Sequence, residues 1–94
     1  MINWSVEVRN EIDKAHDRWG EWSIGGDRLS NERRYLILSE EVGEVAEALV
    51  QQIDSGRFRR GNHSDNLRAE LIQVAAVSVA WVELLDREEA DARR

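Results

Sequence analysis

The chain has 94 residues, a mass of 10.9 kDa and a formal net charge of −6. A single domain of this size, residues 1–94, buries only about 60–65% of its unfolded surface, so we expect it to form an oligomer. The absence of cysteine excludes disulfides, thiolate metal sites and a Cys nucleophile. The acidic balance opposes attraction to nucleic-acid phosphate and to anionic membranes, so neither is an expected partner.

The beginning of the sequence, MINWSVE, has neither the basic start nor the apolar stretch of a signal peptide. We therefore expect a cytoplasmic protein. The most apolar stretch, residues 71–85, is shorter than the roughly 20 apolar residues that a membrane span needs. It predicts a buried helix of an all-α bundle instead.

The first predicted helix runs from Trp4 to Trp19, where apolar residues recur at the helical spacing of three or four. Asn3 or Ser5 is placed to cap its start. This stripe predicts that Trp4 and Trp19 belong to the core, and the apolar run later in the chain predicts the same for Trp81.

The second predicted helix follows a glycine-containing loop, residues 20–30, which carries Trp22. Ser30 and Asn31 form its N-terminal cap. Residues 54–56 end it. Its apolar seam consists of Tyr35, Leu38, Val42, Val45, Leu49 and Ile53.

The third predicted helix comes after a basic loop, residues 57–63, and begins near Asn66 with Ser64 or Asp65 as its cap. Residues 71–85 of this helix are apolar on nearly every side. Such a helix must be covered all round, which two other helices of a short chain cannot easily do. We therefore expect three main helices per chain, completed by a homodimer or tetramer.

Four carboxylates cluster on the second helix. Glu40, Glu44 and Glu47 share one stripe, and Glu41 lies beside Glu44. A solvated acidic face is the ordinary interpretation of such a pattern. Gly43 argues for a site, because a mid-helix glycine costs about 1 kcal/mol relative to alanine and indicates close approach of a backbone, ion or ligand.

The third helix offers Glu70 and, three residues later inside the apolar run, Gln73. A buried amide needs hydrogen-bond partners or a ligand. Two helices that each present oxygens three residues apart suit a hard divalent cation such as Mg²⁺, with Mn²⁺ as a second possibility. No His or Cys lies in the cluster, which disfavours Zn²⁺.

These residues resemble a known family. The sequence EVGE at residues 41–44, followed after twenty-five residues by ELIQ at residues 70–73, resembles the paired acidic motif of the MazG-like all-α nucleoside triphosphate pyrophosphohydrolases, Glu-x-x-Glu and then Glu-x-x-Asp. The surrounding residues 38–49, LSEEVGEVAEAL, look like the second helix of that family. The resemblance covers about residues 8–85.

The resemblance implies Mg²⁺-dependent hydrolysis of an NTP or dNTP between its α and β phosphates, giving a monophosphate and pyrophosphate. It also implies a dimer or tetramer. Mg²⁺ held by Glu41, Glu44 and Glu70, with Gln73 as a further oxygen ligand, would neutralise developing charge. Glu40 is our candidate to position or deprotonate the attacking water, and a solvated carboxylate is its ordinary interpretation.

The chain departs from the family pattern at Gln73, where the second motif usually has Asp. It also lacks the Lys- and Asn-containing segment that follows the third helix in many relatives. Both departures favour an alternative, a catalytically weak or inactive MazG-like oligomer that acts as a nucleotide-binding or protein-interaction module.

The substrate contacts are less closely specified. Trp22 in the glycine-containing loop is placed to stack on a base or to close one end of the bundle. The phosphate contacts expected first are the arginines of the basic loop, Arg57, Arg59 and Arg60, and the other basic candidates are Arg33, Arg34, Lys14 and Arg18. Ordinary salt bridges with the acidic helices are the alternative role for all of them.

Overall fold

The computed structural model describes residues 3–54 and 62–94, with side chains for residues 3–53 and 66–94. The described chain is all helical, as the sequence predicts. It contains α1 (Trp4–Trp19), a short 3₁₀ turn η1 (Gly20–Trp22), α2 (Asn31–Asp54) and α3 (Asn62–Ala92).

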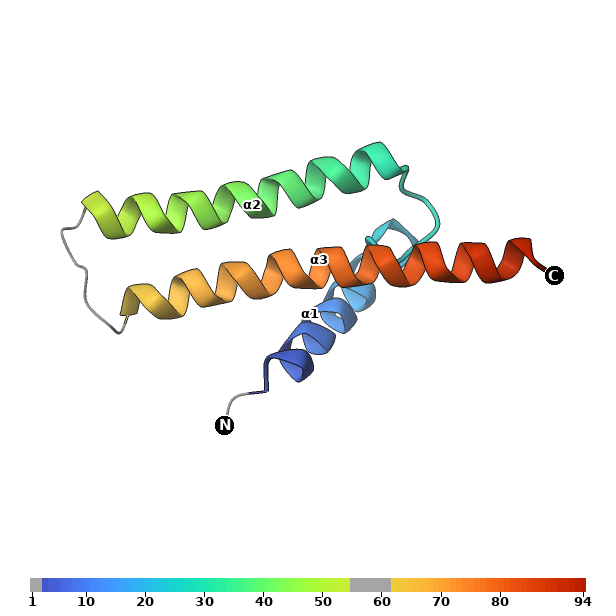
Figure 1. Ribbon diagram of the computed structural model, residues 1–94, viewed down its shortest axis with the longest axis horizontal. Coiled ribbons are helices and arrows are strands. Elements are labelled where there is room, and N and C mark those ends of the chain that lie inside the picture. The colour runs from blue at the N-terminus through green and yellow to red at the C-terminus, as the bar shows by residue number, and fades with distance from the viewer. Residues whose placement is uncertain (1–2, 55–61) are drawn as a thin grey trace.

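The helices form a layer of two with a third laid across it. Figure 1 shows α2 and α3 running antiparallel and side by side, while α1 crosses α3 obliquely. The backbone of α1 packs on α3 and on η1, and within the described residues it does not come near α2. The C-terminal part of α3 extends past the N-terminal end of α2 (Figure 1).

The predicted caps of the first two helices are confirmed. The Asn3 side chain accepts a hydrogen bond from the Ser5 backbone nitrogen at 3.1 Å. The Ser30 hydroxyl accepts one from the Arg33 nitrogen at 3.2 Å, which satisfies a free N–H of the first turn of α2.

The predicted start of the third helix is wrong by four residues, because α3 already begins at Asn62. Ser64 and Asp65, the caps expected from the sequence, therefore lie inside the first turn of α3. The predicted basic loop therefore loses its last two residues to α3, and residues 57–61 lie outside the described residues.

The core lies where α1, the loop after η1, α2 and α3 meet. Ile24, Val77 and Ala80 form its buried centre. The partly buried side chains that pack against this centre come from all three helices and the loop before α2: Ile12, Leu29, Ile37, Leu38 and Trp81. Trp81 is confirmed as a core residue, and its indole nitrogen donates to Oδ1 of Asn31 at 3.0 Å.

The core positions predicted for Trp4 and Trp19 are wrong for the single chain, since their side chains are 63% and 56% exposed. Because the backbone of α1 lies close to α3 and η1 but not to α2, its apolar stripe is buried only in part, at Val8 and Ile12. The apolar seam predicted for α2 is likewise buried only in part. Leu38 packs on the core, whereas Val42 faces outward.

Two arginines hold the loop that follows η1. Arg34 is only 4% exposed and donates to the carbonyl oxygens of Ile24, at 2.8 Å, and Gly26, at 2.6 Å. Arg87 of α3 donates to the carbonyl of the residue between them, Gly25, at 2.7 Å. These bonds satisfy three successive carbonyls and fix Ile24 in the core.

Membrane insertion was not expected from the sequence. None of the described helices combines the length and the apolar character that a membrane-crossing helix requires.

Candidate functional site: a carboxylate cluster between two helices

Three of the predicted carboxylates come together where α2 faces α3. One ligand oxygen from each of Glu41, Glu44 and Glu70 lies within 4.8 Å of the others. The spacing of three residues places Glu41 and Glu44 on neighbouring positions of α2. The two helices run antiparallel and side by side (Figure 1), and Glu70 of α3 lies beside Glu41 and Glu44.

Glu41 has an unusual environment within this cluster. Its Oε2 atom is buried and has no hydrogen-bond partner in the described structure. Burial, and then the negative charge of Glu44, raise the pKa of Glu41 to about 7. A buried acceptor without a partner is costly, so this oxygen is the atom of the cluster most in need of a proton or a cation.

Glu70 is affected by the same neighbours. Hydrogen bonding with Glu44 raises the pKa of Glu70, and burial and the charges of Glu44 and Glu47 act in the same direction. The cluster therefore holds closely spaced acids that do not ionise independently. Within the part of the chain that carries described side chains, no arginine or lysine is paired with Glu41, Glu44 or Glu70.

The donor set fits a hard divalent cation. All three groups offer carboxylate oxygen, the ligand type that Mg²⁺ prefers, and one such oxygen from each lies within 4.8 Å of the others. Glu41, Glu44 and Glu70 could thus hold such an ion, with water or phosphate oxygens as the remaining ligands.

Gln73 points to a different neighbour. Its side-chain nitrogen donates a 2.9 Å hydrogen bond to Oε2 of Glu11, on α1. Glu40 remains exposed on α2, and its charge contributes to the raised pKa of Glu41. The structure thus brings together three of the residues expected at the site, with Glu40 beside them and Gln73 turned to α1.

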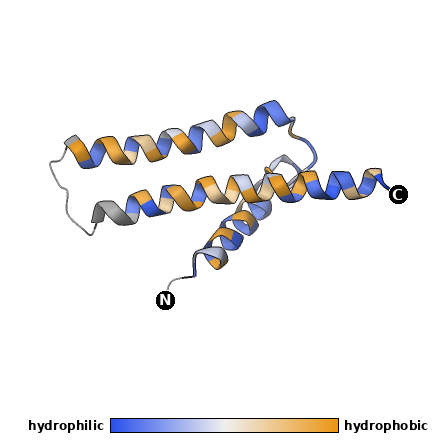
Figure 2. Cartoon of the chain, viewed as in Figure 1, coloured by the Kyte–Doolittle hydropathy of each residue, from blue (hydrophilic) through white to orange (hydrophobic). Residues whose placement is uncertain are grey.

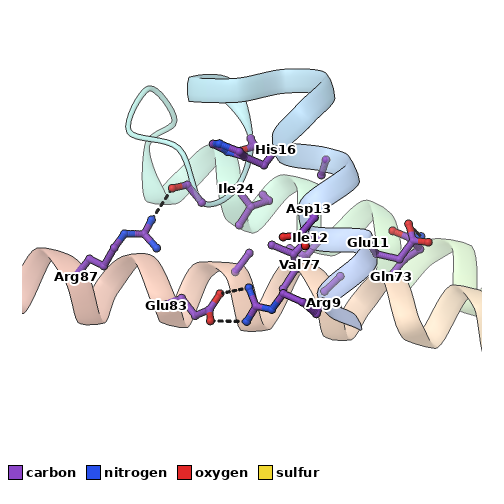
Figure 3. Close-up of a pocket in the computed structure, with 15 residues that line it drawn as sticks. Arg9, Glu11, Ile12, Asp13, His16, Ile24, Gln73, Val77, Glu83 and Arg87 are labelled. Carbon is purple, nitrogen blue, oxygen red and sulfur yellow. Dashed lines mark hydrogen bonds and ion pairs between the residues drawn. The ribbon is translucent and has the colours of Figure 1, made fainter. Parts of the chain in front are cut away.

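A pocket of about 270 Å³ opens between α1, α3 and the loop after η1 (Figure 3). Its apolar lining includes Ile12, Ile24 and Val77. Gln73 also lines it, and because Gln73 follows Glu70 by three residues, the pocket begins within one helical turn of the carboxylate cluster.

Charged side chains surround the opening of this pocket. Arg9 of α1 donates two hydrogen bonds to Glu83 of α3, at 3.1 and 2.6 Å, and both are visible in Figure 3. Arg9, and more weakly Arg87, lower the pKa of Glu83. The sequence does not single out Glu11 and Arg9, because nothing in a single sequence indicates which residues of α1 meet α3.

The expected substrate contacts are less well supported. Trp22 lies in η1 and is exposed. Arg57, Arg59 and Arg60 lie outside the described residues. The suggestion that Arg34 contacts phosphate is wrong, because Arg34 is buried and its donors serve loop carbonyls.

The other basic candidates occupy surface positions. Lys14 pairs with Glu11 at 3.3 Å, and the Arg18 guanidinium lies 5.1 Å from the centre of the Trp19 ring.

No protein-family model, curated protein or solved structure matches the chain.

Proposed function

We propose that the chain is a MazG-like nucleoside triphosphate pyrophosphohydrolase that depends on Mg²⁺ or Mn²⁺ and acts as a homo-oligomer. The observation that carries this proposal is the meeting of Glu41, Glu44 and Glu70 from two helices around a buried oxygen without a partner. The motif resemblance and the pocket that begins one turn away support it.

In this proposal the three carboxylates hold the cation, which when bound would neutralise charge on the triphosphate. Glu40, at the exposed edge of the cluster, orients the attacking water and accepts its proton. The water oxygen bonds to the α-phosphorus while the bond to the bridging oxygen breaks, and pyrophosphate leaves. The apolar pocket between α1 and α3 accommodates the nucleoside.

The experiment that tests this proposal is a panel of NTPs and dNTPs incubated with the purified chain and Mg²⁺ or Mn²⁺. We expect equal amounts of monophosphate and pyrophosphate, with no free orthophosphate. Glu44→Gln removes one charge from the cluster and should abolish turnover. Glu32→Gln is the matched control on an exposed position of the same helix and should leave turnover unchanged.

The Gln73–Glu11 hydrogen bond favours a second candidate, a catalytically weak or inactive MazG-like oligomer that acts as a nucleotide-binding or protein-interaction module. Gln73 carries no charge, and its amide is hydrogen-bonded to Glu11 of α1. The cluster therefore lacks the negative charge that the usual Asp would add. This candidate predicts cation and nucleotide binding in calorimetry without pyrophosphate release. Turnover that is lost in Glu44→Gln would exclude it.

A further inference from the structure

The 270 Å³ pocket has three walls, which come from different parts of the fold (Figure 3). Side chains between residues 73 and 87 of α3 form one wall, and residues 23–25 of the loop after η1 form the second. Side chains between residues 9 and 16 of α1 form the third. Because α1 packs on α3 across this space, a displacement of α1 alone would open the pocket.

The first two walls are firmly held. Helix α3 runs along α2 (Figure 1), and Val77 and Ala80 belong to the buried centre of the core. Arg34 and Arg87 fix the loop through hydrogen bonds to its carbonyl oxygens. These two walls therefore move only if the core itself opens.

The attachment of α1 is more polar. Figure 2 shows hydrophilic and hydrophobic residues mixed along α1, whereas the middle of α3 is mainly hydrophobic. Val8 is the one residue of α1 that is buried, and Ile12 packs on the core while only partly buried. The attachment also includes three polar contacts with α3, which we call the latches: Glu7 with Arg68, Arg9 with Glu83, and Glu11 with Gln73.

Two of the latches are ion pairs at the surface. The side chains of Arg9 and Glu83, and those of Glu7 and Arg68, are between 39% and 50% exposed. Exposed pairs of this kind each add little stability, and dissolved salt weakens them. The closed position of α1 therefore depends on the ionic strength.

The third latch lies at the residue where the chain departs from the MazG-like pattern. Gln73 donates to Glu11 at 2.9 Å, and an ionised Asp at position 73 could not donate this bond. Glu11 and Gln73 both line the 270 Å³ pocket and a second pocket of about 460 Å³. Their hydrogen bond is thus part of the wall between the two pockets, and its loss would join them.

Gly20 provides a pivot for α1. It follows the last residue of the helix, and its φ of 55° lies in the region that favours glycine. A Cβ atom there would meet nothing within 4 Å, so the position needs glycine for its backbone and not for space. The latches involve residues 7–11 of α1, roughly 13 Å or more along the helix from Gly20, so a small rotation at Gly20 separates them.

We propose that α1 is a hinged cover over the 270 Å³ pocket, closed by the latches and opened by rotation at Gly20. Opening exposes the walls on α3 and on the loop, and a ligand with an apolar group of matching size enters while the cover is open. Control of nucleoside entry by this cover rests on the proposed function. The opening itself is a property of the chain without nucleotide or cation.

The test measures how fast a thiol beneath α1 reacts. The chain has no cysteine, so Ala76→Cys introduces a single thiol at a position that lines the pocket and is 5% exposed. Ala48→Cys is the matched control, since Ala48 is 4% exposed on α2 and does not line the pocket. The uncharged reagent N-ethylmaleimide reacts with each thiol only while its surroundings are open.

Raising the NaCl concentration from about 0.01 M to about 1 M shortens the screening length from about 30 Å to about 3 Å. We expect the labelling rate of Ala76→Cys to rise roughly tenfold, because the latches weaken together. The labelling rate of Ala48→Cys should change by less than about twofold, because no latch covers it. Equal changes in the two variants, or no change in Ala76→Cys, would overturn the proposal.

Charge reversal at one latch provides a second arm at low salt. In the Ala76→Cys background, Arg9→Glu brings two carboxylates face to face and should raise the labelling rate severalfold, and adding Glu83→Arg should restore the original rate. Arg33→Glu makes the same charge change at an exposed position of α2 and should have no effect. A double reversal that labels as fast as Arg9→Glu alone would also overturn the proposal.

Both arms remain decisive in the expected difficulties. If Arg9→Glu does not fold, the salt dependence of Ala76→Cys decides. No nucleotide enters either arm, so a failure here leaves the hydrolase proposal intact, and an absence of turnover leaves the hinged cover intact.

Discussion

The side-chain amide of Gln73 on α3 donates to the carboxylate of Glu11 on α1, at 2.9 Å. The other oxygen of Glu11 accepts from Lys14 at 3.3 Å. An ionised aspartate at position 73 has no proton to donate, so it could not make this bond. The residue at which the chain departs from the MazG-like pattern thus contributes to the attachment of α1 to α3.

The first prediction concerns this contact. Gln73→Asp should lower the free energy of unfolding by about 1–2 kcal/mol, because a hydrogen bond to a charged group is lost and two carboxylates then face each other. Urea unfolding in chelator measures the effect. In Glu11→Gln the repulsion is absent, so the double variant should recover about 1 kcal/mol relative to additivity. Strict additivity would show that the two side chains do not interact in solution.

The second prediction concerns cation removal. A ligand that binds only the native state stabilises it by about 2.7 kcal/mol at 100 times its dissociation constant, so Mg²⁺ or Mn²⁺ should raise the melting temperature by several degrees above that in chelator. Glu44→Gln should abolish this increase, while Glu32→Gln should retain it. A wild type whose melting temperature does not respond to either cation would indicate a solvated acidic face.

The third prediction is a pH dependence in chelator. The pKa of Glu41 is raised from 4.5 to about 7, so the folded chain holds a proton that the unfolded chain releases. The resulting stability is complete below pH 4.5, declines as the pH rises, and is lost above about pH 7. The lowered pKa values of Glu7 and Glu83 act in the opposite direction, but only below pH 4.5.

The measurement is the urea midpoint at pH 5.5 and at pH 8. The wild type should be more stable at the lower pH, and Glu41→Gln should reduce the difference because its side chain stays neutral throughout. Glu32→Gln serves as the control and should keep the wild-type difference. If Glu41→Gln also keeps it, Glu41 does not titrate in this range.

The sequence was sufficient for features that depend on neighbouring residues. The helical spacing from Trp4 to Trp19, the caps at Asn3 and Ser30, and the proximity of Glu41 to Glu44 are all local, and they are confirmed. The meeting with Glu70 was expected from two packed helices that each present oxygens three residues apart, and the resemblance to a family pattern supported it.

Features that depend on how whole helices pack could not be predicted in this way. Which side of α1 is buried depends on its crossing of α3, so the exposure of Trp19 was not foreseen. The pairing of Gln73 with Glu11 joins residues 62 positions apart. The single apolar seam predicted for α2 did not show that α3 covers Leu38 but leaves Val42 exposed.

The fourth prediction concerns the buried guanidinium of Arg34. Arg34→Met keeps the aliphatic stem but leaves the carbonyls of Ile24 and Gly26 without their donors, so it should cost about 2–4 kcal/mol. Arg33→Met at the neighbouring exposed position should change stability by less than about 0.5 kcal/mol. Thermal and urea unfolding of the two variants provide the comparison. Equal effects would mean that the loop does not need these bonds.

The last prediction compares two glycines. A Cβ atom on Gly26 would lie 2.2 Å from the carbonyl oxygen of Glu21, whereas a Cβ on Gly43 would meet nothing within 4 Å. Gly26→Ala should therefore force a backbone shift and cost roughly 1–3 kcal/mol. Gly43→Ala should stabilise α2 by about 0.5–1 kcal/mol, since alanine removes the entropic cost of a mid-helix glycine.

The comparison also tests the close approach that the sequence indicates at Gly43. If Gly43→Ala is stabilising and keeps both the oligomeric state and the cation-induced rise in melting temperature, no backbone, ion or ligand needs the space beside it. A loss of either property despite a more stable helix would show that this space is used, because the single chain leaves it open.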